Sequence, residues 1–338
     1  MVDRNGKKPL MSDVHTSLEA VVGKGRILLG EPLAKYTTFK LGGPAQYFFI
    51  AKTSQEVLTA VKTAYTLSIP VTILGGGSNV LISDKGIEGL VIRNESREIR
   101  IVKRLGSIKQ GKPHIGQVLV HVDTGVLINQ LVRFTCDEGL SGLERHLGLP
   151  GTVGGALYMN SKWTHPISYV GDALYSAQII NQDGSLKTVD QHYFKFGYDQ
   201  SILQKTHEIV LTATFLLTQD NSKKVWETAN ASMAYRKETQ PMGVKTAGCT
   251  FRNIPLSDAL RIVTPNGTKS AGYLIDQVGL KTHKIGDAQF SQKHANFIYN
   301  LGNATSSEVK QLIDIAVSKV KEKFHVQIEP EIVLLGKF

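Results

Sequence analysis

The chain has no long apolar run and only two cysteines, and both absences restrict the kind of protein it can be. No stretch of its 338 residues contains the roughly 18 consecutive apolar residues that span a membrane, so we expect no membrane insertion. Residues 1–25 carry basic side chains with no apolar stretch behind them, so we expect a tail with some helix instead of a signal peptide. Cys136 and Cys249 cannot build a disulfide framework, which is typical of a cytoplasmic protein.

Acidic residues are outnumbered, 29 against 39 basic ones, which gives a net charge of +10. Such a charge attracts either nucleic acid or small anions. The basic residues are scattered and no basic run alternates with aromatic residues, which argues against a nucleic-acid partner. We therefore expect an anionic small molecule such as a phosphorylated nucleotide. We expect no metal site.

The most informative short motif is Gly75-Gly-Gly-Ser-Asn79, which lies between the apolar runs 69–74 and 80–82. Its glycines let backbone amides approach a ligand closely, while Ser78 and Asn79 add short hydrogen-bonding side chains. A pyrophosphate suits such a loop. The Rossmann fingerprint needs a glycine where Val80 stands, and the Walker lysine is missing. A glycine-rich hairpin that binds nothing is also consistent with the motif alone.

Helix and strand signals alternate along the chain and predict a mixed α+β protein. Thr53-Ser-Gln-Glu56 is a capping box that opens a helix ending before Pro70, and Thr305-x-x-Glu308 opens a second helix with one apolar stripe. The remaining signals predict a helix over 126–138 and a short helix near 269–277. They predict strands within 173–218, with a turn at Asp183-Gly184, and a strand near 294–300. A hairpin loop is expected over the polar patch 106–113 and a linker over 220–224.

Several longer segments, taken in order, resemble one flavoenzyme family, the UDP-N-acetylenolpyruvoylglucosamine reductases, in their shorter subtype. The resemblance spans about residues 30 to 335. It is carried by Tyr36-Thr-Thr-Phe-Lys-Leu-Gly-Gly-Pro-Ala45, Leu74-Gly-Gly-Gly-Ser-Asn79, Gly139-Leu-Ser-Gly-Leu-Glu144, Leu149-Pro-Gly-Thr-Val-Gly-Gly-Ala156, Phe196-Gly-Tyr198, Ala247-Gly-Cys-Thr-Phe-Arg-Asn253, Ala271-Gly-Tyr-Leu-Ile-Asp276, His294-Ala-Asn-Phe297 and Glu329-Pro-Glu331.

This resemblance implies an α+β fold with a two-part FAD-binding domain of the vanillyl-alcohol-oxidase type and a separate α+β substrate domain. The implied division is a tail over 1–25, a first FAD subdomain over 26–94 joined by 326–338, a second over 95–222, and a substrate domain over 223–325. The implied activity is the NADPH-dependent reduction of UDP-N-acetylglucosamine enolpyruvate to UDP-N-acetylmuramate through FAD, in peptidoglycan precursor synthesis. A cytoplasmic monomer acting on a UDP-sugar is expected.

The resemblance also assigns cofactor-binding and substrate-binding residues. Those implied to contact FAD are Gly75, Gly76, Gly77, Ser78, Asn79, Gly142, Pro150, Gly151, Thr152, Gly154 and Gly155. For Gly139 and Gly142, tight turns without a ligand are an equal alternative. Those implied to contact the UDP part are Arg236, Gln240, Asn253 and His294, since arginine suits a diphosphate and amide or imidazole groups suit a uracil edge. Each of these alone is equally consistent with a surface or turn residue.

Cys249 stands where the family has the serine that gives a proton to the substrate carbon. A thiol with a pKa near ~8.5 is mostly protonated at neutral pH and is a stronger acid than an aliphatic hydroxyl, so it can serve as the donor. The alternative is that Cys249 is a small buried filler. Glu331 matches the family's catalytic glutamate; its alternative is a surface or capping role, and Glu329 is expected to be the exposed neighbour.

Asp199 departs from the family pattern. The family usually has an arginine after Phe196-Gly-Tyr198, and that arginine is held to bind the enolpyruvyl carboxylate. An aspartate should repel such a substrate unless it turns away or another cation compensates. The chain departs from the family again at 161–166, so we hypothesise that Lys162 or His165 compensates; Arg145 and Lys205 are further candidates.

Two other functions remain open at this point. The departure at Asp199 allows a flavoprotein oxidoreductase of the same fold with an altered substrate. It also allows a weakly active or non-catalytic flavin-binding homologue, although Glu331 and an acid at Cys249 argue against that. No pattern for covalent flavin attachment surrounds His146 or Cys136.

Overall fold

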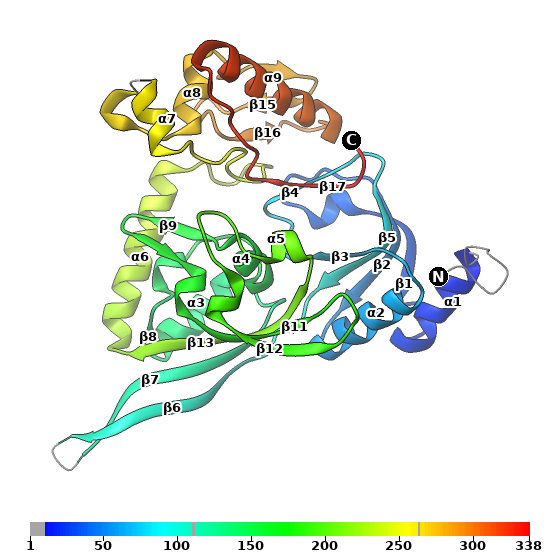
Figure 1. Cartoon of the computed structure of the whole chain (residues 1–338), viewed down its shortest axis with the longest axis vertical. Helices are drawn as coiled ribbons and strands as arrows, with labels where there is room; N and C mark the ends of the chain where they lie inside the picture. Colours follow the sequence, from blue (N-terminus) through cyan, green and yellow to red (C-terminus); the bar gives the residue numbers. More distant parts are fainter. Residues whose placement is uncertain (1–10, 110–111, 263) are drawn as a thin grey trace. The chain divides into compact units, whose positions relative to one another are not determined.

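The computed structural model describes residues 11–109, 112–262 and 264–338 (Figure 1). The chain forms two compact units. Unit 1 comprises the described part of Met1–Leu29 together with Tyr47–Gly76 and Gly89–Glu238, and unit 2 comprises Gly30–Gln46, Gly77–Glu88 and Thr239–Phe338. Each unit combines helices and sheets. None of the helices in these described ranges has both the length and the apolar character needed to cross a membrane.

One layer of unit 1 consists of two helices and most of a four-stranded sheet. The strand order is β1 (Ile27–Pro32), β2 (Pro44–Ala51), β5 (Ile87–Asn94) and β3 (Val71–Leu74), with β3 parallel to β5. Strands β1, β2 and β5 each have a few residues assigned to unit 2. α1 (Met11–Val22) lies beside α2 (Ser54–Thr66). The capping box predicted for α2 forms in part: Thr53 accepts a hydrogen bond from the Glu56 N–H. The apolar face of α2 is buried with Tyr47, Phe49 and Leu18.

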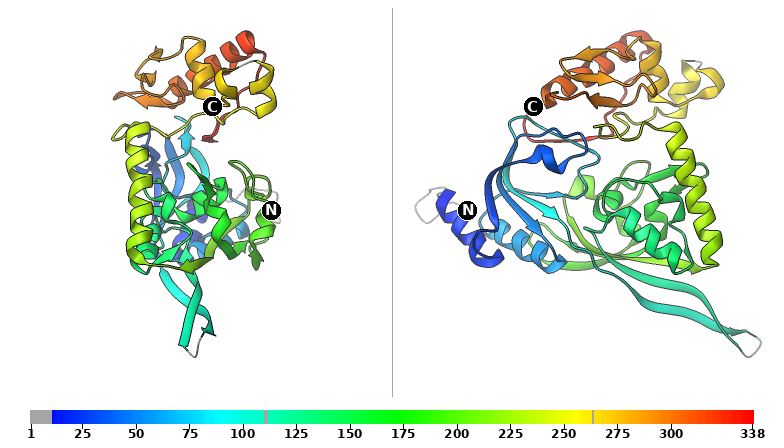
Figure 2. Two further views of the ribbon diagram at one scale, coloured as in Figure 1. Left: turned by 90° about the vertical axis from the view of Figure 1, so that its left-hand side faces the viewer. Right: turned by 180° about the vertical axis from the view of Figure 1, so that it is seen from behind.

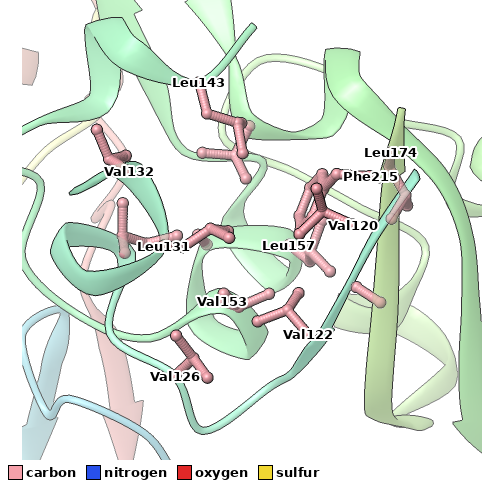
Figure 3. Close-up of a cluster of buried hydrophobic side chains, with 14 of the residues drawn as sticks. Val120, Val122, Val126, Leu131, Val132, Leu143, Val153, Leu157, Leu174 and Phe215 are labelled. Atoms are coloured by element: carbon pink, nitrogen blue, oxygen red, sulfur yellow. The ribbon is translucent and has the colours of Figure 1, made fainter. Parts of the chain in front are cut away.

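The second layer of unit 1 is a larger antiparallel sheet whose helices enclose a separate core. The strand order is β12 (Leu186–Asp190), β11 (Leu174–Ile180), β13 (Ile209–Gln219), β7 (Lys112–Asp123) and β6 (Ile99–Lys109), and β8 (Leu140–Ser141) also pairs with β13. Figure 3 shows side chains of β7 and β13 meeting those of α3 (Ile128–Asp137) and α4 (Val153–Met159). The shorter elements of unit 1 are β9 (Lys162–Thr164), β10 (Ile167–Tyr169) and α5 (Leu203–Thr206).

The hairpin β6–β7 differs from its prediction. Its ladder runs from the Ile99–Val122 pair to the Lys109–Lys112 pair, and Figure 1 shows the two strands extending together beyond the rest of their sheet. Most of the polar patch 106–113 is therefore strand and not loop, because backbone pairing continues through it. Residues 110–111 lie outside the described residues.

The predicted linker at 220–224 is also wrong in part, because α6 (Ser222–Thr239) begins within it. The Asn221 side chain accepts hydrogen bonds from the N–H groups of Lys223 and Lys224, as a helix cap does. Val225 and Ala229 then join the core of unit 1. The polar composition suggested a linker because a helix cap and an exposed helix face contain the same polar residue types as a linker.

Unit 2 has its own core around α9 (Ser306–Phe324). The predicted capping box is complete here, with Thr305 and Glu308 exchanging hydrogen bonds, and the predicted stripe is buried. α9 contacts a small sheet of β14 (Lys284–Ile285), β15 (Ala288–Phe290) and β16 (Ile298–Asn300) (Figure 2). The other elements of unit 2 are α7 (Leu256–Arg261), α8 (Ala271–Gln277) and the parallel pair β4 (Val80–Ile82) and β17 (Val333–Leu335).

The compact units group the chain differently from the four segments implied by the resemblance. α6 lies almost wholly in unit 1, and Gly30–Gln46 lies in unit 2. The C-terminal strand β17 pairs with β4, which lies within the segment 26–94. The four-part division itself stays a prediction.

Candidate functional site

Two of the glycine segments predicted to bind FAD lie against each other in unit 1. A Cβ on Gly75 would be 2.3 Å from Thr152 Oγ1, and a Cβ on Gly76 would be 2.6 Å from Gly151 Cα. Real Cβ atoms do not come so close, so Gly76 requires glycine for a backbone-to-backbone contact with Gly151, and Gly75 packs directly against the Thr152 side chain. The structure thus brings together residues far apart in sequence and leaves no room for side chains between them.

The remaining members of the second glycine segment shape its turn. Gly151 has a φ of 106°, which favours glycine. Thr152 caps α4 by accepting a hydrogen bond from the Gly155 N–H at 3.4 Å. The Gly154 N–H donates to the Thr124 carbonyl at 2.9 Å. Pro150 is exposed. Gly142, with a φ of 132°, donates its N–H to Glu144 in a separate turn.

Unit 2 contains the rest of the first glycine loop. Gly77 has a φ of 64°, and a Cβ there would be 2.1 Å from the Tyr36 carbonyl oxygen. The Thr38 N–H and hydroxyl both donate to the Gly77 carbonyl, and the same hydroxyl lies 2.7 Å from the Thr246 carbonyl. Thr38 therefore connects the glycine loop with the segment leading to Cys249. Thr38 is not among the predicted site residues, although it belongs to the segment 36–45 that carries the resemblance.

Asn79 and Glu331 meet in unit 2. The Asn79 side chain donates to the Glu331 carbonyl at 3.3 Å, and the Val333 N–H donates to the Asn79 carbonyl at 2.9 Å. These contacts begin the parallel pairing of β17 with β4. Glu331 is half-buried, while Glu329 is exposed as expected.

Cys249 lies on a chain segment next to Glu331. The Glu331 N–H donates to the Thr250 carbonyl at 2.7 Å, and Cys249 forms a β-bridge with Phe297. Phe251 likewise forms a bridge with Pro330. The two predicted catalytic residues are thus positioned by adjacent extended segments, and the Cys249 side chain is half-buried and not deep in the core.

Two predicted substrate-binding residues, Asn253 and His294, lie near each other in unit 2, and Gln240 is linked to this region through the Lys293 side chain. Asn253 accepts a hydrogen bond from the Ala271 N–H, at the start of α8. The His294 ring packs there too, because a Cβ on Gly272 would be 3.1 Å from His294 Cε1. Burial lowers the pKa of His294, which favours the neutral imidazole. The Gln240 carbonyl accepts a hydrogen bond from Lys293, the neighbour of His294.

Arg236, the fourth of these residues, belongs to unit 1. It is 6% exposed, and its guanidinium carbon lies 5.2 Å from the centroid of the Trp163 ring. The Tyr235 ring meets Trp163 edge-on at 5.6 Å, and the His165 ring lies 4.9 Å from Tyr235. His165 thus takes part in this aromatic cluster.

Asp199 is paired with a cation. Both of its carboxylate oxygens accept hydrogen bonds from Lys162 Nζ, which also lies 4.1 Å from the centroid of the Tyr198 ring. The side chains of Asp199 and Lys162 are 4% and 14% exposed. The two departures from the family pattern therefore meet in one buried ion pair, and Lys162 offsets the charge of Asp199. Lys205, another candidate, is exposed.

Comparison with known proteins gives matches along almost the whole chain. The profile of a FAD binding domain matches residues 45–190, and that of the UDP-N-acetylenolpyruvoylglucosamine reductase C-terminal domain matches residues 240–335. The chain is 34% identical to the UDP-N-acetylenolpyruvoylglucosamine reductase of Lachnoclostridium phytofermentans, covering 95% of this chain and 96% of the relative. It is 36% identical to that of Bacillus pumilus, covering 95% and 97%.

Solved structures give the same result. The crystal structure of UDP-N-acetylenolpyruvylglucosamine reductase from Thermus caldophilus matches with a TM-score of 0.69 and 31% identity, over 92% of this chain and 98% of that one. A VAO-type flavoprotein from Myceliophthora thermophila matches with a TM-score of 0.50 at 10% identity, over 92% and 78%, which is a likeness of fold alone. The predicted fold class is confirmed.

Proposed function

This chain belongs to the UDP-N-acetylenolpyruvoylglucosamine reductase family, and we propose that it performs the family's reduction with Cys249 as the proton donor and Glu331 beside it. It is a flavin-dependent oxidoreductase that reduces UDP-N-acetylglucosamine enolpyruvate to UDP-N-acetylmuramate in peptidoglycan precursor synthesis. NADPH is the expected source of reducing equivalents. The observation that carries the proposed roles is the 2.7 Å hydrogen bond between Glu331 and Thr250, which positions both candidate groups.

The residues of this chain fit FAD as the cofactor, and the profile of a FAD binding domain covers the segments concerned. Gly76 packs on the Gly151 backbone and Gly75 on Thr152, so the two glycine-rich loops lie together, and loops of this kind can offer backbone N–H groups to a pyrophosphate. When bound, FAD carries hydride equivalents from the nicotinamide to the substrate. The protein supplies binding, orientation and the proton.

Reduction of an enolpyruvyl ether requires a proton on the carbon next to the one that accepts hydride. We assign this proton to the Cys249 thiol. A thiol is the stronger acid compared with the serine hydroxyl of the family, so the replacement preserves the role. Glu331 lies on the adjacent segment. We propose that the Glu331 carboxyl group orients the substrate by acting near the substrate carboxylate, where negative charge develops during the reaction.

Substrate recognition is divided among groups suited to a UDP-sugar. We propose that Gln240, Asn253 and His294 contact the nucleotide, supported by their placement around the start of α8 and Lys293. Neutral imidazole and amide groups can both donate and accept hydrogen bonds with a uracil edge. We propose that Arg236 contacts the diphosphate, as its permanent charge allows.

The charge of Asp199 is the main chemical objection to this substrate. Lys162 supports the proposal because it neutralises that carboxylate. An altered substrate is therefore not required by the departure at Asp199. We further propose that the enzyme works as a monomer in the cytoplasm.

The two half-reactions test the assignment of Cys249. Purified protein should be yellow, should bleach with NADPH, and should reoxidise with UDP-N-acetylglucosamine enolpyruvate faster than with oxygen. In stopped-flow measurements, Cys249→Ala should leave flavin reduction nearly unchanged and slow reoxidation by about 100-fold or more, as expected for loss of a general acid. Cys249→Ser is the matched control and should stay within about tenfold of wild type.

The results of these measurements distinguish an error in the proposed reaction from an error in the role assigned to Cys249. Equal loss in both half-reactions for Cys249→Ala would mean a defect in folding or binding, and unchanged reoxidation would remove Cys249 from the mechanism. A protein that binds FAD but is not reoxidised by the substrate would contradict the proposed reaction itself.

A further inference from the structure

Three potential metal ligands lie together in unit 1, although the sequence led us to expect no metal site. Glu98, His121 and Asp123 each offer one ligand atom, and these atoms all lie within 4.8 Å of one another. They lie where β6 begins and β7 ends, a place that Figure 1 shows within the larger sheet. None of them has a role in the reaction proposed above.

Strand geometry explains why the three side chains meet. His121 and Asp123 are two residues apart in β7, so their side chains point to the same face of the sheet. Glu98 lies opposite Asp123, because the Asp123 N–H donates to the Glu98 carbonyl at 2.9 Å. The Glu98 N–H returns a hydrogen bond to Asp123 Oδ2 at 3.1 Å.

Asp123 has a buried oxygen that these contacts do not satisfy. The residue is 3% exposed, and within the described part of the chain no hydrogen-bond partner reaches its Oδ1. A buried carboxylate oxygen without a partner costs free energy unless a cation or a donor meets it. This oxygen is an observation independent of the clustering, and it calls for a cation or a hydrogen-bond donor beside it.

We propose that Glu98, His121 and Asp123 form a binding site for a divalent cation of the zinc class. Imidazole nitrogen and carboxylate oxygen are both donors that zinc accepts, and water can complete the coordination of an ion held by these three residues. Magnesium and calcium prefer sets made only of oxygen ligands, so they should bind this site more weakly. Two carboxylates also balance the charge of the ion.

Arg100 is the group that opposes a cation at this position. Its Nε lies 2.5 Å from Glu98 Oε1, and it pairs with His121 across the ladder. The Arg100 and Glu98 side chains are 55% and 52% exposed, so their ion pair contributes little and can be displaced. The cation and Arg100 therefore compete for Glu98.

The position of the site gives it a structural role. Thr124 follows Asp123, and its carbonyl accepts the Gly154 N–H while its hydroxyl donates to the Leu211 carbonyl. A cation held by Glu98, His121 and Asp123 would fix the end of β7 and, through Thr124, the glycine segment proposed to bind FAD. It would act as a brace and not as a catalyst.

The test is metal binding by untagged protein freed of metal with a chelator. Isothermal titration with zinc chloride should show one equivalent bound in the micromolar range or tighter, and magnesium chloride should show far weaker binding. His121→Ala and Glu98→Gln should each weaken zinc binding by about tenfold or more. Arg100→Gln should tighten it by about two- to fivefold, the effect of removing one exposed competing ion pair.

Controls exclude zinc bound to other side chains or lost through unfolding. His283→Ala removes an exposed histidine of unit 2 and should leave zinc binding unchanged. Circular dichroism in the presence of chelator should show each variant folded, and Glu98→Gln changes an exposed side chain, which should preserve the fold. Wild-type protein that binds no zinc, or zinc affinity unchanged in both His121→Ala and Glu98→Gln, would overturn the proposal.

Discussion

Asp199 and Lys162 form an ion pair that water reaches only slightly, since their side chains are 4% and 14% exposed. Desolvating two charges is costly, and their attraction repays the cost only when both partners are present. An aspartate at this position therefore depends on the lysine from the hairpin β9–β10. Asp199 also has a φ of 53°, a left-handed conformation that aspartate and asparagine tolerate better than most residues.

Lys162→Met should destabilise the fold by about 3 kcal/mol, because it leaves the Asp199 carboxylate buried without its cation. The double variant Lys162→Met/Asp199→Asn should recover most of that loss. Urea unfolding measures both. Lys224→Met is the matched control, since it removes the lysine of an exposed pair with Asp220 and should cost less than about 1 kcal/mol. Equal losses in the single and double variants would contradict this account.

His146 is another buried residue whose charge state matters. It is fully buried in unit 1, and its Nε2 lies 3.4 Å from the Ser168 hydroxyl. Burial, with a further contribution from the nearby Arg236 charge, lowers the pKa of His146 from 6.5 to about 4. The folded protein thus holds this imidazole neutral over a range in which the unfolded chain protonates it.

The free energy of unfolding should therefore fall as the pH drops from 6.5 to about 4. Below that pH, the contribution of His146 should no longer change. The sign follows from the lowered pKa, because the unfolded state binds the proton first and gains free energy from it. The loss due to His146 should approach about 3 kcal/mol. Unfolding free energies of His146→Leu should show a shallower acid slope than wild type, while the exposed His192→Ala should keep the wild-type slope. Parallel slopes for His146→Leu and wild type would refute the assignment.

At the scale of elements, the sequence correctly predicted the helices whose positions are determined by short-range patterns. The capping residues Thr53 and Thr305 and the apolar stripe that follows each one identified α2 and α9. The same reasoning failed for α6, where Asn221 begins a helix within polar residues, and for β6 and β7, whose length depends on pairing between strands. Local composition does not determine such pairing.

The contact between the two glycine segments was not visible in the sequence either. The sequence showed that Gly75–Asn79 and Pro150–Gly155 were rich in glycine, and the resemblance assigned both to one cofactor. It did not show that Gly76 and Gly151 touch, because this depends on how β3 and α4 are placed within unit 1.

Gly76→Ala should separate these two segments. The added Cβ would be 2.6 Å from Gly151 Cα, and backbone on both sides has little freedom to move. We expect a loss of about 1–3 kcal/mol in stability from overpacking and a roughly tenfold or larger weakening of FAD binding. Quenching of flavin fluorescence measures the affinity. Gly116→Ala in β7 adds a methyl group where nothing lies within 4 Å, and it should change neither quantity. Wild-type flavin affinity in Gly76→Ala would show that the contact does not shape the cofactor site.

At the scale of the whole molecule, each unit has its own hydrophobic core and contains some of the residues proposed to bind FAD or substrate. Unit 1 contains Gly75, Gly76 and Gly151, while unit 2 contains Cys249, Glu331 and the end of the glycine loop. The resemblance could assign these residues one by one, but only the fold showed which of them are neighbours, since pairs such as Cys249 and Glu331 are distant in sequence.

The net charge of +10 also acts on the whole molecule. Both the UDP-sugar and NADPH are anions, so a positive field should increase their rate of association. Raising the salt concentration from about 10 mM to about 150 mM shortens the Debye length from about 30 Å to about 8 Å and should weaken this attraction. We expect kcat/KM for both substrates to fall by about three- to tenfold over this range, while kcat stays nearly constant because it does not include the encounter.

Steady-state kinetics across a potassium chloride series measure this effect. Reduction of the bound flavin by a neutral chemical reductant is the internal control, since its rate should not fall with salt. A kcat/KM that is insensitive to salt would mean that the positive charges lie where they do not influence the approach of substrate. The excess of basic residues would then not raise the association rate of anionic ligands, and the positive electrostatic field would affect only solubility.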